Sequence, residues 1–460
     1  MRKKILLLAV ALTLLLSRPV SAQTSGPVYI VQSGDTLWDI AIRFNVAMTD
    51  LMTANGLSDA NLHVGQELVI PGLEGLTGVL DTEVVGFGDS LRGLARRNQT
   101  PVELLRRLNH ITSPSELYVG VSLVVPKQDE GQTLTASASP AAGETLLEVA
   151  VRENSDPWTL SSLNSLNGTW DALPGDVLYS KSGTGRQTAS GLPAAFVSAE
   201  VKRLPFKQGG TAEIIVQPAA GATLGGMLVD HPLRFVDTGD GKQVALQGIH
   251  VELEPGAYPL RLDATLPDGS VQSFEQMVLV KFGVHNPNVQ PVPPMDPKLT
   301  EEETQLIASI ASAVTPVKYW QAAFTRPVGS PYCVTEWFGT PRTYTFNGDE
   351  FGYFHSGVDY GVCSETNPLD IFAAAPGKVV FTGLLNIRGN ATIIDNGWGV
   401  YTVYGHQSEI RVVVGQDVQA GDIIGQIGST GHVTGPHLHW EMWVNGVQGD
   451  PLDWLDAAIP

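Results

Sequence analysis

The sequence predicts a multidomain protein with N-terminal α+β repeats and an all-β middle domain, followed by a separate C-terminal domain. Three observations indicate this organisation: a motif that recurs three times, a middle region of short alternating strands, and a histidine-rich C-terminal region. The chain has 460 residues, which is too long for one hydrophobic core. Hydrophobic residues make up 43% and charged residues 16%, so the composition is that of a folded protein.

The N-terminal repeats share a motif of glycine, an acidic residue, a hydroxyl residue and leucine. The motif occupies residues 34–37, 88–91 and 143–146, and an asparagine follows twenty positions after each acidic residue. In the first copy, Thr36 can cap a helix that has apolar residues on one face. The third copy lacks the residues typical of an opening strand. We therefore expect βααβ units at 27–72 and 79–127, and a degenerate unit at 134–181.

The first repeat resembles a LysM domain over residues 29–37 and 64–71, which have the sequences YIVQSGDTL and VGQELVIP. The resemblance implies binding to glycans that contain N-acetylglucosamine. It assigns glycan binding to the motif residues and asparagines of the two better copies: Gly34, Asp35, Thr36, Asn55, Gly88, Asp89, Ser90 and Asn109. The alternative is a purely structural repeat, and this alternative is strongest for the third copy.

The middle of the chain has linker compositions at 127–142, 180–193 and 285–298, the last of which is rich in proline. Between the last two linkers, alternating segments at 196–201, 212–216, 258–262 and 274–280 predict strands. We expect an immunoglobulin-like β-sandwich over residues 194–283. Residues 237–241 fit either a calcium loop or a plain hairpin turn.

A proline-rich linker and a helix are expected over residues 284–324. The helix is predicted at 300–314, where Thr300 and Glu303 match a capping box. Its apolar stripe consists of Leu306, Ile307, Ile310 and Val314.

The N-terminus predicts export from the cytoplasm. Basic residues at 2–4, an apolar run at 5–16 and small residues at 20–22 fit a signal peptide covering residues 1–22, with an uncleaved anchor as the alternative. We expect a secreted or cell-envelope protein without stable membrane insertion after cleavage. In such a protein, the only two cysteines, Cys333 and Cys363, predict a disulfide bond.

The net charge argues against nucleic acid as a partner. The whole chain has 28 Lys+Arg and 47 Asp+Glu, and cleavage after residue 22 would remove four of the basic residues and none of the acidic ones. A strongly acidic protein lacks the basic surface that phosphate backbones require.

Three C-terminal segments contain residues that can bind a metal or transfer protons. They hold His355 and Asp359, then His406, then His437 and His439. The last pair precedes an aromatic and branched run that predicts a strand, so both imidazoles should point to the same side, with Cα atoms about 7 Å apart. A loop or bent strand must bring His355 and Asp359 together. Nitrogen and oxygen ligands of this kind suit Zn²⁺, and the spacing leaves open which of these histidines bind it.

The same residues resemble the lysostaphin/LytM-type zinc endopeptidases. The similar segments are 355–360, 374–379 and 428–441, within a region that extends over 325–456. The resemblance implies a mainly antiparallel-β domain with a zinc site in a groove, and cleavage of peptidoglycan stem peptides or cross-links. It assigns His355, Asp359 and His439 to one zinc ion per chain, and His406 and His437 to catalysis.

Together these features predict a zinc-dependent peptidoglycan endopeptidase that LysM domains bring to the cell wall. Its expected partners are the glycan strands and stem peptides of peptidoglycan. The alternatives are a catalytically silent regulator of other cell-wall hydrolases and a glycan-binding adhesin. The presence of all five metal and catalytic residues favours the enzyme.

Overall fold

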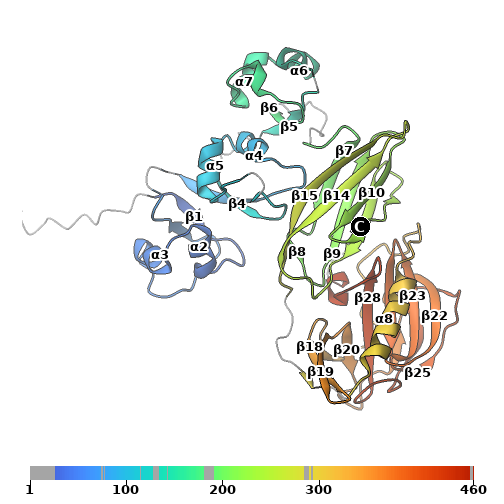
Figure 1. Ribbon diagram of the computed structural model, residues 1–460. Helices are drawn as coiled ribbons and strands as arrows, with labels where there is room; N and C mark the ends of the chain where they lie inside the picture. The colour runs from blue at the N-terminus through green and yellow to red at the C-terminus, as the bar shows by residue number, and fades with distance from the viewer. Residues whose placement is uncertain are drawn as a thin grey trace, which may run out of the picture. The chain divides into compact units, whose positions relative to one another are not determined.

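The computed structural model describes residues 26–73, 76, 78–113, 116–127, 134–141, 143–180, 191–283, 290–291, 294–455 and 459 (Figure 1). The predicted signal peptide and parts of the predicted linkers lie outside the described residues. The chain forms two compact units. One comprises residues up to 83, 90–116 and 122–189, and the other comprises 84–89, 117–121 and 190–460. None of the helices within the described ranges has the length and apolar character needed to cross a membrane.

The first two repeats have the predicted βααβ order. The first contains β1 (Val28–Ile30), α2 (Leu37–Arg43), α3 (Met48–Asn55) and β2 (Glu67–Val69). The second contains β3 (Val79–Val84), α4 (Leu91–Arg97), α5 (Val102–Leu108) and β4 (Ser122–Pro126). Strand β1 pairs antiparallel with β2 and parallel with β3, so the two repeats share one sheet of order β2-β1-β3-β4.

The third repeat has the same order of strands and helices despite its degenerate sequence. It contains β5 (Thr135–Ala138), α6 (Leu146–Arg152), α7 (Pro157–Leu163), the 3-10 helix η2 (Thr169–Asp171) and β6 (Leu178–Ser180). Although its sequence lacks the residues typical of an opening strand, β5 takes that place and pairs antiparallel with β6. A strand pair is held by backbone hydrogen bonds, which a segment without typical strand residues can also form.

The middle domain consists of two sheets, of order β11-β10-β14-β15-β8 and β12-β13-β9-β7. The strands are β7 (Phe196–Lys202), β8 (Phe206–Lys207), β9 (Thr211–Pro218), β10 (Thr223–Leu228), β11 (His231–Pro232), β12 (Val236–Asp237), β13 (Gln243–Gly248), β14 (Gly256–Thr265) and β15 (Val271–Lys281). One core joins the two sheets, with Ile214 and Val216 from one sheet and Leu260, Leu262 and Val278 from the other. All four predicted strands are confirmed, whereas immunoglobulin-like connectivity stays a prediction.

Residues 237–241 form the turn between β12 and β13. The carboxylate of Asp240 accepts hydrogen bonds from the Thr238 hydroxyl and the Lys242 amide, and the Asp237 carboxylate accepts one from the Gly239 amide. Because these carboxylates close the turn itself, the structure favours the hairpin interpretation over a calcium loop.

The C-terminal domain is built on an eight-stranded sheet. Its order is β17-β20-β28-β24-β23-β22-β26, with β29 paired to β28, and the pairs are antiparallel as expected. These strands are β17 (Cys333–Glu336), β20 (Val358–Gly361), β22 (Gly377–Leu385), β23 (Gly389–Gly397), β24 (Val400–Gly405), β26 (Asp417–Val418), β28 (His437–Val444) and β29 (Val447–Gly449). The predicted disulfide is confirmed: Cys333 and Cys363 are bonded, with their Cα atoms 6.4 Å apart.

Two smaller sheets and a 3-10 helix complete this domain. One sheet has the order β16-β18-β19 and the other β21-β27-β25. Their strands are β16 (Gln290–Pro291), β18 (Pro341–Phe346), β19 (Asp349–Phe354), β21 (Asp370–Phe372), β25 (Gln407–Ile410) and β27 (Ile423–Ile427), and the 3-10 helix is η3 (Pro451–Trp454).

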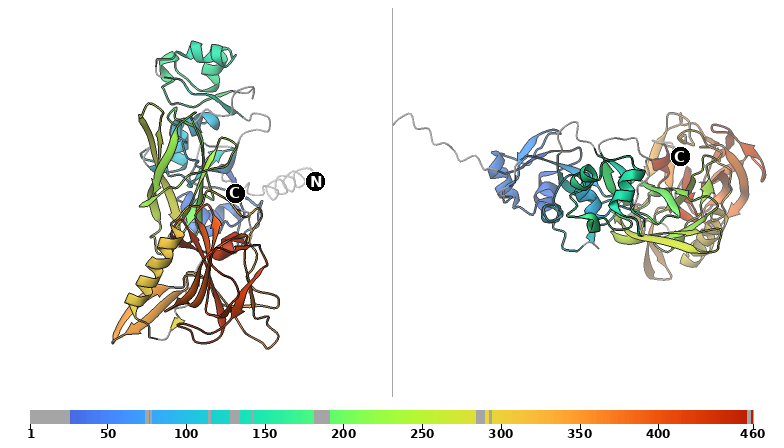
Figure 2. Two further views of the ribbon diagram at one scale, coloured as in Figure 1. Left: turned by 90° about the vertical axis from the view of Figure 1, so that its right-hand side faces the viewer. Right: turned by 90° about the horizontal axis from the view of Figure 1, so that it is seen from above.

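Helix α8 (Pro297–Ala311) lies alongside the large sheet, as Figures 1 and 2 show. The predicted capping box is wrong, since the helix begins earlier, with Asp296 as its N-cap. The Thr300 hydroxyl donates to the Asp296 carbonyl, and the Glu303 carboxylate is buried against Arg388. This contact explains why Glu303 does not serve as a capping residue. A charge-assisted hydrogen bond to a buried guanidinium is stronger than a hydrogen bond to a neutral backbone amide at the helix end.

The middle domain and the C-terminal domain share a hydrophobic core. Val244 and Leu246 of β13 belong to the same cluster of buried side chains as Trp320 and Phe324. Removal of the middle domain would expose this apolar surface to water, which is unfavourable. The C-terminal domain is therefore best studied in the intact chain.

Candidate active site

The central strand β28 brings the predicted site residues together. It pairs with β20 on one side and β24 on the other, and this register places His439 opposite both Asp359 and Gly405. His406 follows directly after β24, so it lies next to this point. His355 precedes β20, as predicted, across a short bend that contains Gly357. A side chain at Gly357 would collide with the Trp440 carbonyl oxygen at 2.4 Å, which explains the glycine.

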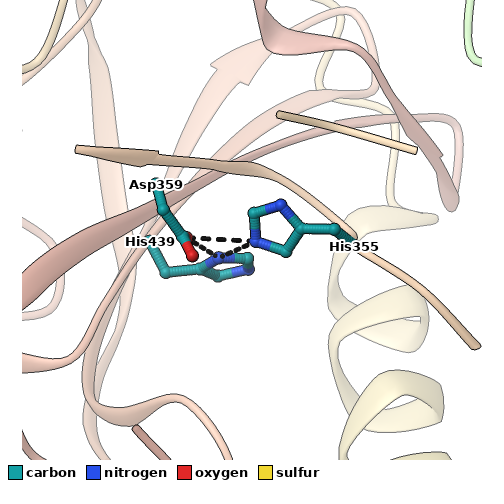
Figure 3. A group of neighbouring side chains, drawn as sticks. All are labelled: His355, Asp359 and His439. Carbon is teal, nitrogen blue, oxygen red and sulfur yellow. Dashed lines mark hydrogen bonds and ion pairs between the residues drawn. The ribbon is translucent and has the colours of Figure 1, made fainter. Parts of the chain in front are cut away.

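The three predicted metal ligands converge on one point (Figure 3). Asp359 Oδ1 is 2.7 Å from His439 Nδ1 and 3.1 Å from His355 Nε2, and these two nitrogens are 3.1 Å apart. Ligands about 2.0–2.1 Å from a tetrahedral Zn²⁺ lie roughly 3.3 Å from one another, so the spacing is close to that of a zinc site. All three residues are buried.

Hydrogen bonds orient the ligand histidines. His355 Nδ1 lies 3.0 Å from the Trp337 carbonyl oxygen, which can only accept, so the proton is on Nδ1 and the Nε2 lone pair faces the other ligands. His439 has the opposite arrangement: Nε2 lies 2.7 Å from Glu441 Oε1, which leaves Nδ1 facing Asp359.

The two predicted catalytic histidines lie beside the ligands. Their ring centroids are 4.7 Å apart, and His406 is 5.7 Å from His439. His406 Nδ1 bonds the Thr430 carbonyl at 2.8 Å, and His437 Nδ1 bonds the Gly435 carbonyl at 2.9 Å. In the neutral rings these bonds place the proton on Nδ1, so each Nε2 is available as a base.

The backbone of His406 adopts a left-handed conformation, with φ of 60°. A histidine in this region is uncommon, and the surrounding structure must hold it there. Its amide donates to the Arg388 carbonyl at 2.7 Å, and its ring is fixed by Thr430.

Electrostatics keep the ligand carboxylate ionised and His406 neutral. Burial opposes ionisation of Asp359, but the charges and hydrogen bonds of His355 and His439 hold its pKa well below 3.8. Burial lowers the pKa of His406 to about 3, and repulsion from His439 and His437 adds to this shift. His406 is therefore uncharged at neutral pH, as a base must be.

Buried charge around the site is negative overall. Two guanidiniums lie among four carboxylates: Arg342 bonds Glu336 and lies 3.7 Å from Asp359, and Arg388 bonds Glu303 and Glu441. These groups, within this described part of the site, carry two more negative than positive charges. Burial lowers the pKa of His439, but its hydrogen bonds to Asp359 and Glu441 and their charges outweigh this effect and raise the pKa to about 9, so without a cation a proton on His439 balances one of the two excess negative charges. A divalent cation would neutralise them, and buried charges require such compensation.

A groove adjoins the ligands. Besides the ligands Asp359 and His439, it is lined by aromatic, polar, charged and aliphatic side chains: Met295, Thr300, Glu336, Arg342, Tyr344, Tyr353, Phe354, Ser356, Ile387, Arg388, His406, His432, Val433, Thr434 and His437.

Sequence reasoning gave Glu441, Arg388 and Glu303 no role at this site. Glu441 had a detectable signal, because alternate residues of a strand share a face and Glu441 lies two positions after His439. Arg388 and Glu303 come from distant segments, and their proximity to the site follows only from the fold.

The predicted glycan-binding residues of the first repeat have structural contacts. The carboxylate of Asp35 accepts bonds from the Tyr29 hydroxyl and the Gln32 amide, and pairs with Arg43. Thr36 caps α2 by accepting from the Asp39 amide. Gly34 has φ of 90°, a turn conformation that favours glycine.

Asn55 links α3 to β2 in the first repeat. Its amide group donates to the carbonyls of Leu51 and Val69, and its oxygen accepts from the Val69 amide. Asn109 and Asn164 make the same three bonds in the other repeats.

In the second repeat, Ser90 caps α4, whereas the backbones of Gly88 and Asp89 form hydrogen bonds with a residue of β15. The Gly88 amide donates to the side chain of Gln276, which in turn donates to the Asp89 carbonyl. Thus the structure gives each motif residue a role in the fold, and glycan contact by these residues stays a prediction.

Comparison with known protein families identifies two kinds of domain. Residues 29–71 and 84–126 match the LysM domain, and residues 353–451 match Peptidase family M23. The chain carries LysM domains and a Peptidase M23 domain. The M23 match includes all five predicted metal and catalytic residues, whereas the third repeat lies outside the LysM matches.

Several named proteins are similar to part of this chain. DD-carboxypeptidase/endopeptidase Mpg of Neisseria meningitidis is 36% identical over 130 residues, which cover 26% of this chain and 29% of that protein. Peptidoglycan DD-endopeptidase ShyA of Vibrio cholerae is 39% identical over 106 residues, 23% of each chain. Lysostaphin of Staphylococcus staphylolyticus is 38% identical over 113 residues, again 23% of each. The chain spans less than a third of the length of these relatives.

Among solved structures, a putative peptidase M23 from Pseudomonas aeruginosa is similar to part of this chain. The similarity covers 55% of this chain and 96% of that one, with 25% sequence identity and a TM-score of 0.39.

Proposed function

We propose that this protein is a zinc-dependent endopeptidase that cleaves the stem peptides or cross-links of peptidoglycan outside the cytoplasm. The observation that carries the proposal is the convergence of His355, Asp359 and His439 beside His406 and His437, whose Nδ1 atoms bond backbone carbonyls and whose Nε2 atoms are left for proton transfer. His437 Nε2 itself lies 3.5 Å from Asp359 Oδ2. The names of similar proteins, two of which include "endopeptidase", support the reaction class.

The donor set fits one Zn²⁺ ion. Two imidazole nitrogens and one carboxylate oxygen are ligands that zinc prefers, and three protein ligands leave a position open for catalysis. The excess negative charge of the surrounding carboxylates, part of which a proton on His439 balances when no cation is bound, suits a divalent cation. Bound there, zinc would act as a Lewis acid and make water a stronger acid.

The two catalytic histidines would manage the protons. An uncharged Nε2 of His406 or His437 can accept a proton from the attacking water and later return it to the leaving amine. After accepting a proton, the same group becomes a donor that can stabilise negative charge on the scissile carbonyl oxygen. The bonds of both Nδ1 atoms to backbone carbonyls keep the rings in place during these steps.

The LysM repeats would hold the enzyme on glycan strands. In the first repeat, Trp38 and Ile42 lie on the outward face of α2, with Trp38 62% exposed. An exposed tryptophan offers a flat apolar face with one hydrogen-bond donor, which suits a sugar ring. We therefore assign glycan contact in this repeat to the exposed face of α2 as well as to the predicted motif residues.

The test uses the full chain, since the C-terminal domain shares its core with the middle domain. Elemental analysis should find one zinc per chain, and incubation with peptidoglycan should release new amino groups in a zinc-dependent way. Asp359→Ala should lose both properties. Asp349→Asn, a change of an exposed carboxylate in the same domain, is the matched control and should retain both.

A regulator of other hydrolases would give a different result. It would release no amino groups from peptidoglycan of any cross-link type, with or without zinc. This outcome in the full chain would reject the enzyme, and full zinc content in Asp359→Ala would reject the ligand assignment.

A further inference from the structure

We propose that Glu303, Arg388 and Glu441 form a buried positioning network that holds both the ligand His439 and the catalytic His406. Helix α8, which supplies Glu303, is then part of the catalytic centre although it lies outside the region matched to Peptidase family M23. The inference rests on the proposed function, because it concerns residues that would act on a bound zinc ion.

Glu441 determines which nitrogen of His439 faces the other ligands. Its Oε1 lies 2.7 Å from His439 Nε2 and accepts bonds from Ser356 at 3.0 Å and Arg388 at 2.6 Å. Its Oε2 accepts from Trp443 Nε1 at 2.7 Å. An ionised carboxylate can only accept, so Glu441 holds a proton on His439 Nε2. Nδ1 faces the Asp359 carboxylate at 2.7 Å, and a metal bound there would replace the proton on Nδ1 and take its lone pair, while Glu441 keeps the Nε2 proton in place.

Arg388 connects this pair to the catalytic side of the site. Its guanidinium lies between Glu441 and Glu303, at 2.6 Å and 3.1 Å, and its carbonyl accepts the His406 amide at 2.7 Å. The left-handed backbone of His406 thus depends on where the Arg388 backbone lies.

Glu303 fixes that backbone. Its two carboxylate oxygens accept the amides of Ile387 at 2.8 Å and Arg388 at 3.0 Å. Glu303, Arg388 and Glu441 are each less than 5% exposed in their side chains. One carboxylate from α8 therefore fixes both the main chain and the side chain of the residue that contacts His406 and Glu441.

The energetics favour a positioning role over a stabilising one. Burying charged groups costs free energy that their mutual attraction often only offsets, and an apolar cluster of similar volume would stabilise the fold equally well. An apolar cluster, however, could not set the tautomer of His439 or accept the His406 amide. The directional bonds of this network are the property that catalysis needs.

The experiment compares three Glu→Gln variants of the full chain: Glu441→Gln, Glu303→Gln and, as the matched control, Glu409→Gln on the surface. Zinc affinity is measured by competition with a chromogenic chelator, and kcat and KM are measured on cross-linked muropeptides at saturating zinc. Glu441→Gln should weaken zinc affinity about 10- to 100-fold, as loss of such partners typically does. Glu303→Gln should lower kcat about tenfold, with zinc affinity and KM within about threefold, and Glu409→Gln should change nothing.

Either of two results would overturn the network. One is zinc affinity and kcat within about threefold of wild type in both Glu441→Gln and Glu303→Gln. The other is a lower melting temperature of the metal-free protein with neither zinc affinity nor kcat changed, which is the signature of a purely structural role.

If Glu441→Gln does not fold, Trp443→Phe replaces it, since it removes one donor to Glu441 and retains an aromatic ring. It should weaken zinc affinity at least threefold, and unchanged affinity would again overturn the inference. Failure of the wild type to bind zinc would reject the proposed function and the network together, whereas a failure confined to the variants rejects the network alone.

Discussion

The N-terminal repeats and the C-terminal domain both contain short polar motifs, but the structure uses these motifs differently. In the repeats, the hydrogen-bonding atoms of Asp35, Thr36 and Asn55 bond to neighbours within the same repeat. In the C-terminal domain, His406 and His437 bond a carbonyl through one ring nitrogen and direct the other toward the ligands. A motif whose polar atoms satisfy local backbone maintains a fold. A motif that directs such atoms toward one buried point indicates chemistry.

The largest expected effect tests the two Nε2 atoms that face the predicted ligands. His406→Ala and His437→Ala should each lower turnover on cross-linked muropeptides by about 10²- to 10⁴-fold, because each removes a group that transfers protons in the transition state. Zinc content should stay at one per chain, since neither residue belongs to the ligand triad. The double variant should lose less than the product of the two single losses.

His432→Ala is the control for this comparison. His432 lines the same groove, but its amide bonds the Ile387 carbonyl and no catalytic role is assigned to it. Its loss should change turnover by less than about tenfold. Equal effects of His432→Ala and His437→Ala would mean that groove shape, rather than proton transfer, limits the reaction.

Much of this architecture is predictable from sequence, because local patterns carry it. The recurring motif predicts the three repeats, and the alternation of apolar and polar residues predicts four strands of the middle domain. Branched and aromatic residues predict the strand His437–Val444. The missed elements lack such patterns. Strand β10 contains Gly225 and Gly226, which disfavour a strand locally. Strands β8, β11 and β12 have two residues each, which is too few to show the apolar and polar alternation of a strand.

The site is only partly predictable for the same reason. His355, Asp359, His406, His437 and His439 belong to short motifs with recognisable spacing. Arg388 and Glu303 belong to no motif, and they lie 85 positions apart in the sequence. Their contact depends on how α8 packs against the large sheet, which no local pattern specifies.

The next effect tests the structural role of the asparagines. Asn55→Ala removes three hydrogen bonds and leaves the Val69 amide without its partner, so the first repeat should lose about 2–4 kcal/mol of stability. Hydrogen exchange of the α3 and β2 amides in the full chain should show this loss, because exchange reports local unfolding. Binding to insoluble peptidoglycan should fall only as far as the repeat unfolds.

Asn61→Ala is the matched control, because Asn61 is an exposed asparagine in the same repeat. Its exchange rates should equal those of the wild type. If Asn55→Ala abolished glycan binding with exchange rates unchanged, Asn55 would be a direct glycan ligand, and the contrast between the two motifs would fail.

The smallest effect concerns helix caps, which also differ between the two regions. In the repeats, the caps Thr36, Ser90 and Thr145 are neutral and the acidic cap of α7, Asp156, is exposed, whereas η3 of the C-terminal domain is capped by the half-buried Asp450. Burial raises the pKa of Asp450 from 3.8 to about 6, with the Asp453 charge adding to the shift and the Leu452 amide opposing it. The ionised carboxylate is therefore less favourable in the folded chain than in the unfolded one.

The sign of the pH dependence follows. The cost of ionising Asp450 is fully present above about pH 6 and disappears below about pH 4, where the group is protonated in both states. Asp450→Asn removes this cost, and the asparagine oxygen can still accept the Leu452 amide. We expect roughly 1–2 kcal/mol of added stability at pH 7.5 and none at pH 4, measured by chemical unfolding followed through tryptophan fluorescence. Asp349→Asn, on the exposed surface of β19, should show no such pH-dependent gain. A gain for Asp450→Asn that is equal at both pH values would mean that packing, rather than the charge of a buried cap, separates this domain from the repeats.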